Sequence, residues 1–146
     1  IQHAGVVLGI GGVAGHLFKR YPPDHPGPLG LIEVTRNVSA VTFACAMLRR
    51  AIYEEVGGLD DEHLPVSFND VDFCLRVRQR GYQVIYAPRA VLYHYESATR
   101  SMLPSSMPGE IEYMQATWAE VIRRDPFYNP NLTLTREDGS IAVETA

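Results

Sequence analysis

The sequence predicts an α/β fold in one domain. Short apolar runs rich in β-branched residues are typical of buried strands, and they alternate with segments whose apolar residues recur at helical spacing. The 146 residues are 46% hydrophobic and 21% charged, which is near the average of globular domains. This length suits a single domain or part of one. Because strands and helices are interleaved, α/β is favoured, and α+β stays open.

Charge and hydropathy argue against two broad classes of protein. Lys and Arg number 13 and Asp and Glu number 17, which gives a net charge of −4 and disfavours non-specific nucleic-acid binding. No apolar run approaches the ~20 residues of a membrane-spanning helix. The chain begins at Ile1, directly in strand-like sequence, and we interpret it as part of a longer polypeptide.

The first predicted strand covers residues 4–9, and a glycine-rich turn follows it. Residues 9–14 fit the pattern G-x-G-x-x-A, and Glu33 follows at roughly the distance of a ribose-binding acid. A small dinucleotide-binding domain is therefore one alternative. That alternative requires a long helix beginning at the glycines, but only residues 13–21 precede Pro22, and they are poorly amphipathic. We therefore favour a simple turn.

A loop, a strand and a short helix are expected next. Residues 21–30 contain four prolines and two glycines, a density that excludes a regular element. Residues 38–48 are small, apolar and β-branched, and they predict a buried strand. A short helix is expected over residues 50–56. Gly57 and Gly58 end it, because glycine adopts the left-handed cap conformation without steric cost.

Residues 69–80 predict a longer helix, capped at its start by Asn69. Positions i and i+2 of a helix point about 200° apart, so Asp70 and Asp72 do not form a two-carboxylate metal site. Asp70 instead heads the apolar stripe that faces the core. It is interpreted as a single poised carboxylate, with helix capping as the structural alternative. Asp72 is expected to pair with Arg76 one turn later.

The remaining residues predict two more strands and a second long helix. Alternating apolar residues indicate strands over residues 82–86 and 90–95. His94 lies near the end of the second strand, where ligand sites of α/β proteins form, so it is a satisfied polar residue or a metal or phosphate ligand. A helix is expected over residues 110–124, with Trp118 packed in the core rather than lining a binding groove.

Residues 35–100 resemble a known family in the order of several motifs. A small-residue strand end precedes RR and a short helix, and then come EVGGLDDE, a loop, the helix NDVDFCLR, GY and two strands that end at a histidine. This order resembles the C-terminal, acceptor-side portion of the catalytic domain of family-two glycosyltransferases, which have the GT-A fold. Residues 1–15 and the segment DPFYNPNLTL also resemble members that act on surface polysaccharides. The resemblance implies that residues 1–146 form one partial domain with a mixed sheet flanked by helices, in which residues 110–146 are a C-terminal helix and tail.

The resemblance implies catalytic and phosphate-binding roles for three residues. Asp70 matches the base that takes the proton from the acceptor hydroxyl as that oxygen attacks the anomeric carbon in an inverting displacement. His94 matches a histidine that helps to hold a divalent metal or the diphosphate. Arg100 is expected to clamp the diphosphate through charge-assisted contacts.

The resemblance also implies a substrate-binding role for three residues near the base. Thr42 and Phe43 match a strand end beside the donor sugar and the acceptor, and Asn69 directly precedes the base. Phe43 stands where many members have glycine, which narrows the expected pocket. Asn69 stands where glutamate is usual, which makes the field around Asp70 less negative. The sequence has no QxxRW motif, so a processive synthase is disfavoured.

The implied reaction requires partners besides this chain. They are a nucleotide-diphospho-sugar donor, a glycan or lipid-linked acceptor, and a divalent metal, Mn or Mg, whose main DxD ligands are expected outside this chain. We therefore expect the isolated chain to be inactive, and to self-associate through an unpaired sheet edge. The family implies a cytoplasmic location, and attachment to the inner face of the membrane stays open. A non-catalytic carbohydrate-binding or scaffolding domain is the alternative function.

Overall fold

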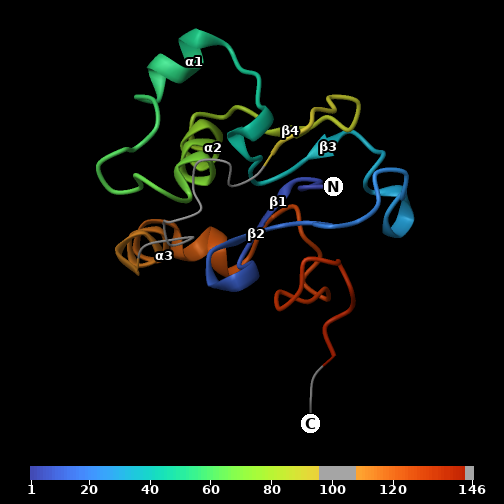
Figure 1. Cartoon of the computed structure of the whole chain (residues 1–146). Helices are drawn as coiled ribbons and strands as arrows, with labels where there is room; N and C mark the ends of the chain where they lie inside the picture. The colour runs from blue at the N-terminus through green and yellow to red at the C-terminus, as the bar shows by residue number, and fades with distance from the viewer. Residues whose placement is uncertain (96–107, 144–146) are drawn as a thin grey trace.

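The computed structural model describes residues 1–95 and 108–143, and it contains both helices and small β-sheets (Figure 1). The strands are β1 (Val6–Leu8), β2 (Ala14–His16), β3 (Arg36–Asn37) and β4 (Ile85–Tyr86). The α-helices are α1 (Arg50–Glu55), α2 (Asn69–Gln79) and α3 (Pro108–Arg123). Single 3-10 turns lie at Ile10–Gly12, Pro28–Gly30 and Phe43–Cys45. The predicted mixture of helices and strands is confirmed at this level.

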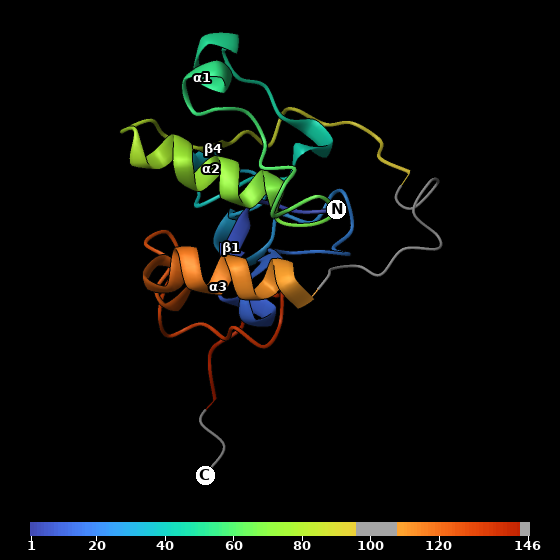
Figure 2. The same ribbon diagram turned by 90° about the vertical axis from the view of Figure 1, so that its left-hand side faces the viewer.

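The two long helices lie alongside one another, with β1 behind them (Figure 2). Helix α1 stands at the periphery in both views, and the C-terminal tail passes beside β2. None of the helices in the described parts of the chain is long and apolar enough to span a bilayer. The pair of long helices therefore forms one side of the fold, and the strands form the other.

Two antiparallel ladders make up the sheets. In the first, Val6 lies opposite His16 and Leu8 lies opposite Ala14. In the second, β3 pairs with β4. An isolated bridge joins β1 to the segment that follows β3, where the Val6 N–H donates to the Ala40 carbonyl at 2.9 Å. The resemblance implied a mixed sheet, but within the described residues both ladders are antiparallel, so that part of the prediction is wrong.

The glycine-rich turn connects the two strands of a hairpin. Gly9 has φ 88°, in the left-handed region, and its N–H donates to the Val13 carbonyl at 2.8 Å. A Cβ atom on Gly9 would lie 2.8 Å from the Ile122 carbonyl oxygen, so helix α3 also requires glycine here. The chain returns antiparallel to β1 rather than starting a crossover helix. The dinucleotide-binding alternative is therefore wrong.

Strand β1 is buried on both faces. Because side chains alternate along a strand, Val6 and Leu8 join one apolar cluster and Val7 joins another. The first cluster also contains Leu64, Val71, Cys74, Leu75, Val84, Met114, Trp118 and Ile122. The second contains Ala4, Ile10, Leu17, Phe18 and Ile32. The hairpin thus separates the helix-side core from a smaller core, and the prediction that Trp118 is a core residue is confirmed.

The three helix predictions are confirmed, but the predicted cap of α2 is wrong. Phe68, with φ 61°, occupies the N-cap position, and Asn69 is already helical. The Asn69 side-chain amide instead donates to the Leu64 carbonyl at 3.2 Å. The side chain therefore holds the preceding loop rather than a backbone N–H of the helix.

Two predicted strands are wrong in whole or in part. Of residues 38–48, Val38 donates its N–H to the Val84 carbonyl at 3.0 Å and Ala40 bridges to β1, but the chain then turns and Met47 is 99% exposed. Residues 90–95 form no strand, and Tyr93 is 92% exposed. A strand needs a neighbour that pairs with its backbone groups, and among the described residues neither 41–48 nor 90–95 takes part in such pairing.

Candidate active site

Asp70 lies in the first turn of α2 and contacts the segment that follows β3. Its Oδ2 accepts a hydrogen bond from the Phe43 N–H at 3.1 Å, and its Oδ1 accepts one from the Val71 N–H at 2.8 Å. Both carboxylate oxygens are therefore held by backbone amides, and the group is half-buried. The structure thus brings together two predicted site residues, Asp70 and Phe43, that are 27 positions apart.

Thr42 and Asn69 flank this contact from the two sides. Thr42 is buried directly before Phe43, and Asn69 directly precedes Asp70. The Phe43 ring packs edge-on against Phe73 of α2, with ring centroids 5.2 Å apart. Phe43 therefore contributes its amide to Asp70 and its ring to the surface of α2. No comparable polar contact joins the Asn69 amide to Asp70, because that amide is bonded to the preceding loop.

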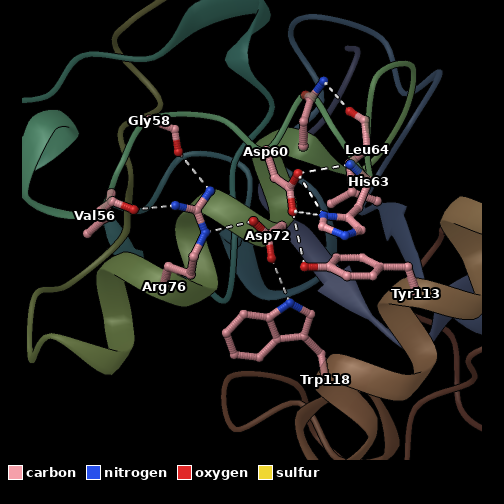
Figure 3. Close-up of polar contacts among 10 residues, drawn as sticks. Val56, Gly58, Asp60, His63, Leu64, Asp72, Arg76, Tyr113 and Trp118 are labelled. Carbon is pink, nitrogen blue, oxygen red and sulfur yellow. Dashed lines mark hydrogen bonds and ion pairs between the residues drawn. The ribbon is translucent and has the colours of Figure 1, made fainter.

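Asp72, the second aspartate of α2, has different hydrogen-bond partners from Asp70. Asp72 is 2% exposed, and its Oδ2 accepts from Arg76 Nε at 2.7 Å, as the one-turn spacing predicts. Its Oδ1 accepts from Trp118 Nε1 at 2.9 Å, which joins α2 to α3 (Figure 3). Asp72 is therefore a structural carboxylate. Asp70 and Asp72 are thus bonded to different partners, Asp70 to the amides of Phe43 and Val71 and Asp72 to Arg76 and Trp118.

Arg76 extends this network to the end of α1. Its guanidinium donates to the Val56 carbonyl and, at 2.7 Å, to the Gly58 carbonyl (Figure 3). Carbonyls at a helix C-terminus lack partners within the helix, so a cation here satisfies two of them and complements the helix dipole. The same arginine thus compensates the charge of Asp72 and holds the glycine-containing turn after α1.

The surroundings of His94 differ from those of Asp70. Its ring is exposed, and its Nδ1 lies 3.0 Å from Gln2 Oε1. Arg100 lies outside the described residues. Within residues 1–95 and 108–143, no group of three His, Cys, Asp or Glu side chains is arranged to hold a metal ion. The described residues therefore do not fit a metal site by themselves, and the metal role of His94 stays a prediction.

A cluster that sequence reasoning missed joins the loop before α2 to helix α3. Asp60 accepts from the His63 N–H at 2.9 Å and from the Tyr113 hydroxyl at 3.0 Å. The His63 ring stacks on Tyr113, with centroids 4.5 Å apart and planes 8° from parallel. Although its partial burial acts in the opposite direction, the hydrogen bonds from His63 and Tyr113 lower the pKa of Asp60. Partial burial and the bond to Asp60 raise the pKa of Tyr113.

Glu110 is a second residue that sequence reasoning missed. It is 2% exposed, and its Oε1 accepts from the Val66 N–H at 2.7 Å and from the Ser67 N–H at 3.1 Å. A signal for it exists in the sequence, because Glu110 lies four residues before Met114 on the stripe that continues to Trp118. A carboxylate on the buried stripe of a helix must find partners, and here they are loop amides.

A separate cleft of ≈ 490 Å³ lies between the hairpin and the C-terminal tail. It is lined by Ile10, Gly11, Ala14, Gly15, Lys19, Thr135, Arg136, Glu137 and Asp138. None of these is a predicted site residue. Two of its carboxylates already accept hydrogen bonds. Glu137 accepts from the His16 N–H at 2.8 Å, and Asp138 accepts from the Ser140 hydroxyl at 2.6 Å. The candidate active site is therefore placed at the Asp70–Phe43 contact and not in this cleft.

The chain is similar to parts of much longer curated proteins. It is 46% identical over 143 residues to the uncharacterized protein y4gI of Sinorhizobium fredii, a match covering 94% of this chain and 16% of that protein. It is 41% identical over 144 residues to the O-antigen biosynthesis protein RfbC of Myxococcus xanthus, covering 94% of this chain and 11% of that protein.

A more distant similarity covers about half of the chain. It is 28% identical over 71 residues to an N-acetylglucosaminyl-diphospho-decaprenol L-rhamnosyltransferase of Mycobacterium tuberculosis, covering 49% of this chain and 23% of that protein. No family model matches the chain, and no solved structure is significantly similar to it. The chain thus corresponds to a small part of each of these relatives, so a whole protein's activity is a matter for proposal.

Proposed function

We propose that this chain is the acceptor-side part of a GT-A glycosyltransferase that takes part in surface-polysaccharide assembly. The reaction is transfer of a sugar from a nucleotide-diphospho-sugar to a hydroxyl of a glycan or a lipid-linked acceptor. Two relatives support this by name, one as an O-antigen biosynthesis protein and one as a rhamnosyltransferase. Because the chain spans only 11% and 23% of those proteins, the activity belongs to the longer polypeptide.

The observation that supports this most is the arrangement around Asp70. Two backbone amides hold its carboxylate at the start of α2, so its orientation does not depend on a flexible side-chain partner. In the proposed inverting displacement, Asp70 accepts the proton of the acceptor hydroxyl while that oxygen attacks the anomeric carbon. The bond to the leaving nucleoside diphosphate breaks in the same step. A positioned base of this kind contributes typically 10²–10⁴-fold to the rate.

The other proposed roles fall around this base. Thr42 and Phe43 shape the sugar side of the site, and Asn69 holds the loop that leads into it. We assign the divalent metal, Mn²⁺ or Mg²⁺, to ligands in the longer protein, where its chemistry is to stabilise the leaving diphosphate. His94 and Arg100 are proposed to approach that diphosphate from this chain. Asp72 takes no part, because its oxygens are bonded to Arg76 and Trp118.

The test compares two aspartate variants of the full-length protein. Asp70→Asn removes the base and keeps the shape of the side chain, whereas Asp61→Asn changes an exposed carboxylate in the loop before α2. Transfer is measured with UDP- and dTDP-sugars and Mn²⁺, on lipid-linked glycan extracted from the source strain deleted for this gene. We expect Asp70→Asn to lose at least about 100-fold in kcat with donor affinity nearly unchanged, and Asp61→Asn to resemble the wild type.

Retained activity in Asp70→Asn would remove this residue as the base. No transfer by the wild-type protein with any of these donors would count against the glycosyltransferase proposal, and glycan binding without transfer would favour the carbohydrate-binding alternative. A calorimetric titration of the 146-residue chain with the same donors and Mn²⁺ tests the assignment of the donor site. We expect no binding in the micromolar range, and micromolar binding would contradict that assignment.

A further inference from the structure

Glu110 presents a buried carboxylate to the backbone amides of a loop. Carboxylates are almost never fully buried unless they are partnered, and Glu110 accepts from the amides of Val66 and Ser67, at 2.7 and 3.1 Å. Amide hydrogen bonds to a charged oxygen are stronger than those to a neutral one. The start of α3 therefore holds the end of the 60–67 loop in one position.

The same helix also holds the beginning of this loop. The Tyr113 hydroxyl donates to Asp60 Oδ2 at 3.0 Å, and the Tyr113 ring stacks on His63 (Figure 3). Glu110 and Tyr113 lie three residues apart, which places them on neighbouring positions of one helix face. Both ends of the loop are thus anchored to a single turn of α3.

The end of this loop determines where α2 begins. Ser67 is followed by Phe68, which has φ 61°, a conformation that non-glycine residues keep only where their surroundings enforce it. The Phe68 carbonyl accepts the Asp72 N–H at 2.8 Å and so starts the helix. Asp70 is the second residue of that helix. A displacement of Val66 and Ser67 would therefore move Asp70 relative to the Phe43 amide.

We propose that Glu110 is a positioning residue for Asp70. It acts through the loop amides of Val66 and Ser67, which fix the left-handed turn at Phe68 and with it the first turn of α2. The role proposed for Glu110 is exerted through this loop and not through contact with the substrate. This inference rests on the proposed function for its catalytic consequence, but its structural part is measurable without any activity.

The kinetic test uses three variants of the full-length protein. Glu110→Gln keeps an Oε1 atom that accepts both amide hydrogen bonds, Glu110→Ala removes it, and Glu112→Ala changes an exposed carboxylate on the same helix. We expect Glu110→Ala to lower kcat on the order of 10- to 100-fold with KM for donor and acceptor within about twofold, because a misplaced base costs rate rather than binding. Glu110→Gln should keep most of kcat, and Glu112→Ala should match the wild type.

The second test measures amide hydrogen exchange in the same proteins, at a temperature where each is fully folded. Glu110→Ala should speed exchange at Val66 and Ser67, and also at Phe43, whose amide reports the position of Asp70. Asp70→Ala is the matched reference, because it should release the amides of Phe43 and Val71 and leave those of Val66 and Ser67 unchanged. Faster exchange at Val66 and Ser67 with unchanged exchange at Phe43 and unchanged kcat would show a purely structural role and overturn the proposal. If the wild type shows no transfer, the proposed function fails, and exchange at Phe43 alone decides whether Glu110 positions Asp70.

Discussion

Two regions of this protein surround a titratable side chain differently, one with an opposite charge and the other without. At the interface of α2 and α3, Asp72 is bonded to a guanidinium and to an indole N–H. Near the N-terminus, the half-buried imidazole of His3 has its ring centroid 5.5 Å from that of His16, and its Nδ1 accepts the Gly5 N–H at 2.9 Å. The first region supplies an opposite charge to a buried group, and the second does not.

The second region consequently keeps its histidine neutral. Burial, followed by the neighbouring His16 and Arg36, lowers the pKa of His3 to about 4. The Tyr86 ring also faces it, 6.3 Å away, and Arg36 lies over the same tyrosine ring. The comparison shows that burial alone does not decide whether a charged form is tolerated. Desolvation is the largest cause of the low pKa of His3, and the neighbouring His16 and Arg36 act in the same direction instead of offsetting it.

The largest expected effect is at Asp72. Asp72→Ala leaves Arg76 without its carboxylate and Trp118 without its acceptor, so we expect a loss of about 3–5 kcal/mol in the free energy of unfolding. Urea denaturation followed by tryptophan fluorescence measures this, and Asp61→Ala, at an exposed site, should stay within about 0.5 kcal/mol of the wild type. A loss below about 1 kcal/mol for Asp72→Ala would mean that the network is not stabilising.

A smaller effect is expected when only one bond of the same network is removed. Trp118→Phe keeps most of the apolar ring but deletes the Nε1–H that Asp72 accepts at 2.9 Å. We expect a loss of about 1.5–3 kcal/mol, the range for a hydrogen bond to a charged group. The decisive measurement is a double-mutant cycle with Asp72→Asn, followed by circular dichroism. Simple additivity of the two losses would show that the two side chains do not interact energetically.

The smallest effect, and the one that tests the N-terminal region, is a pH dependence. The pKa of His3 is about 4 in the folded chain and 6.5 in its ordinary state, so the unfolded state binds the proton more tightly. The contribution of His3 to the free energy of unfolding is therefore complete above about pH 7 and is lost as the pH falls through 6.5 toward 4. Between pH 7.5 and pH 5 the free energy of unfolding should fall by about 2 kcal/mol from this group.

The reference for this measurement is His3→Gln, which cannot titrate. The difference between wild-type and variant unfolding free energies should change by that amount across the window, whereas contributions from the carboxylates cancel. A constant difference between pH 7.5 and pH 5 would contradict the low pKa of His3. Unlike the losses at Asp72 and Trp118, this loss should be fully reversible when the pH is raised.

Local features of the sequence were sufficient for the helices. The spacing of Met114, Trp118 and Ile122 predicts α3 and its buried face, and the one-turn separation of Asp72 and Arg76 predicts their pair. Each of these depends on contacts within about four residues, which a helix brings together whatever the rest of the chain does. The position of Asp70 in the first turn of α2 follows from the same local pattern.

Strand pairing depended on the rest of the chain. Residues 38–48 and 90–95 have apolar patterns typical of strands, yet only the first few residues of the earlier segment pair with a neighbour. A β-strand forms only when another segment pairs with its backbone groups. The apolar pattern therefore shows that a segment can form a strand, not that it does. The placement of β1 between two apolar clusters likewise required the packing of both helices and the hairpin.

The sequence by itself determined the helices and the glycine turn, and its resemblance to a known family proposed Asp70 as the base. Only the tertiary structure decided that Asp70 contacts the Phe43 amide, that Trp118 bonds to Asp72, and that Glu110 holds the loop before α2. These contacts join residues 27, 46 and 44 positions apart. No periodic pattern relates positions so distant, because their meeting depends on how whole elements pack.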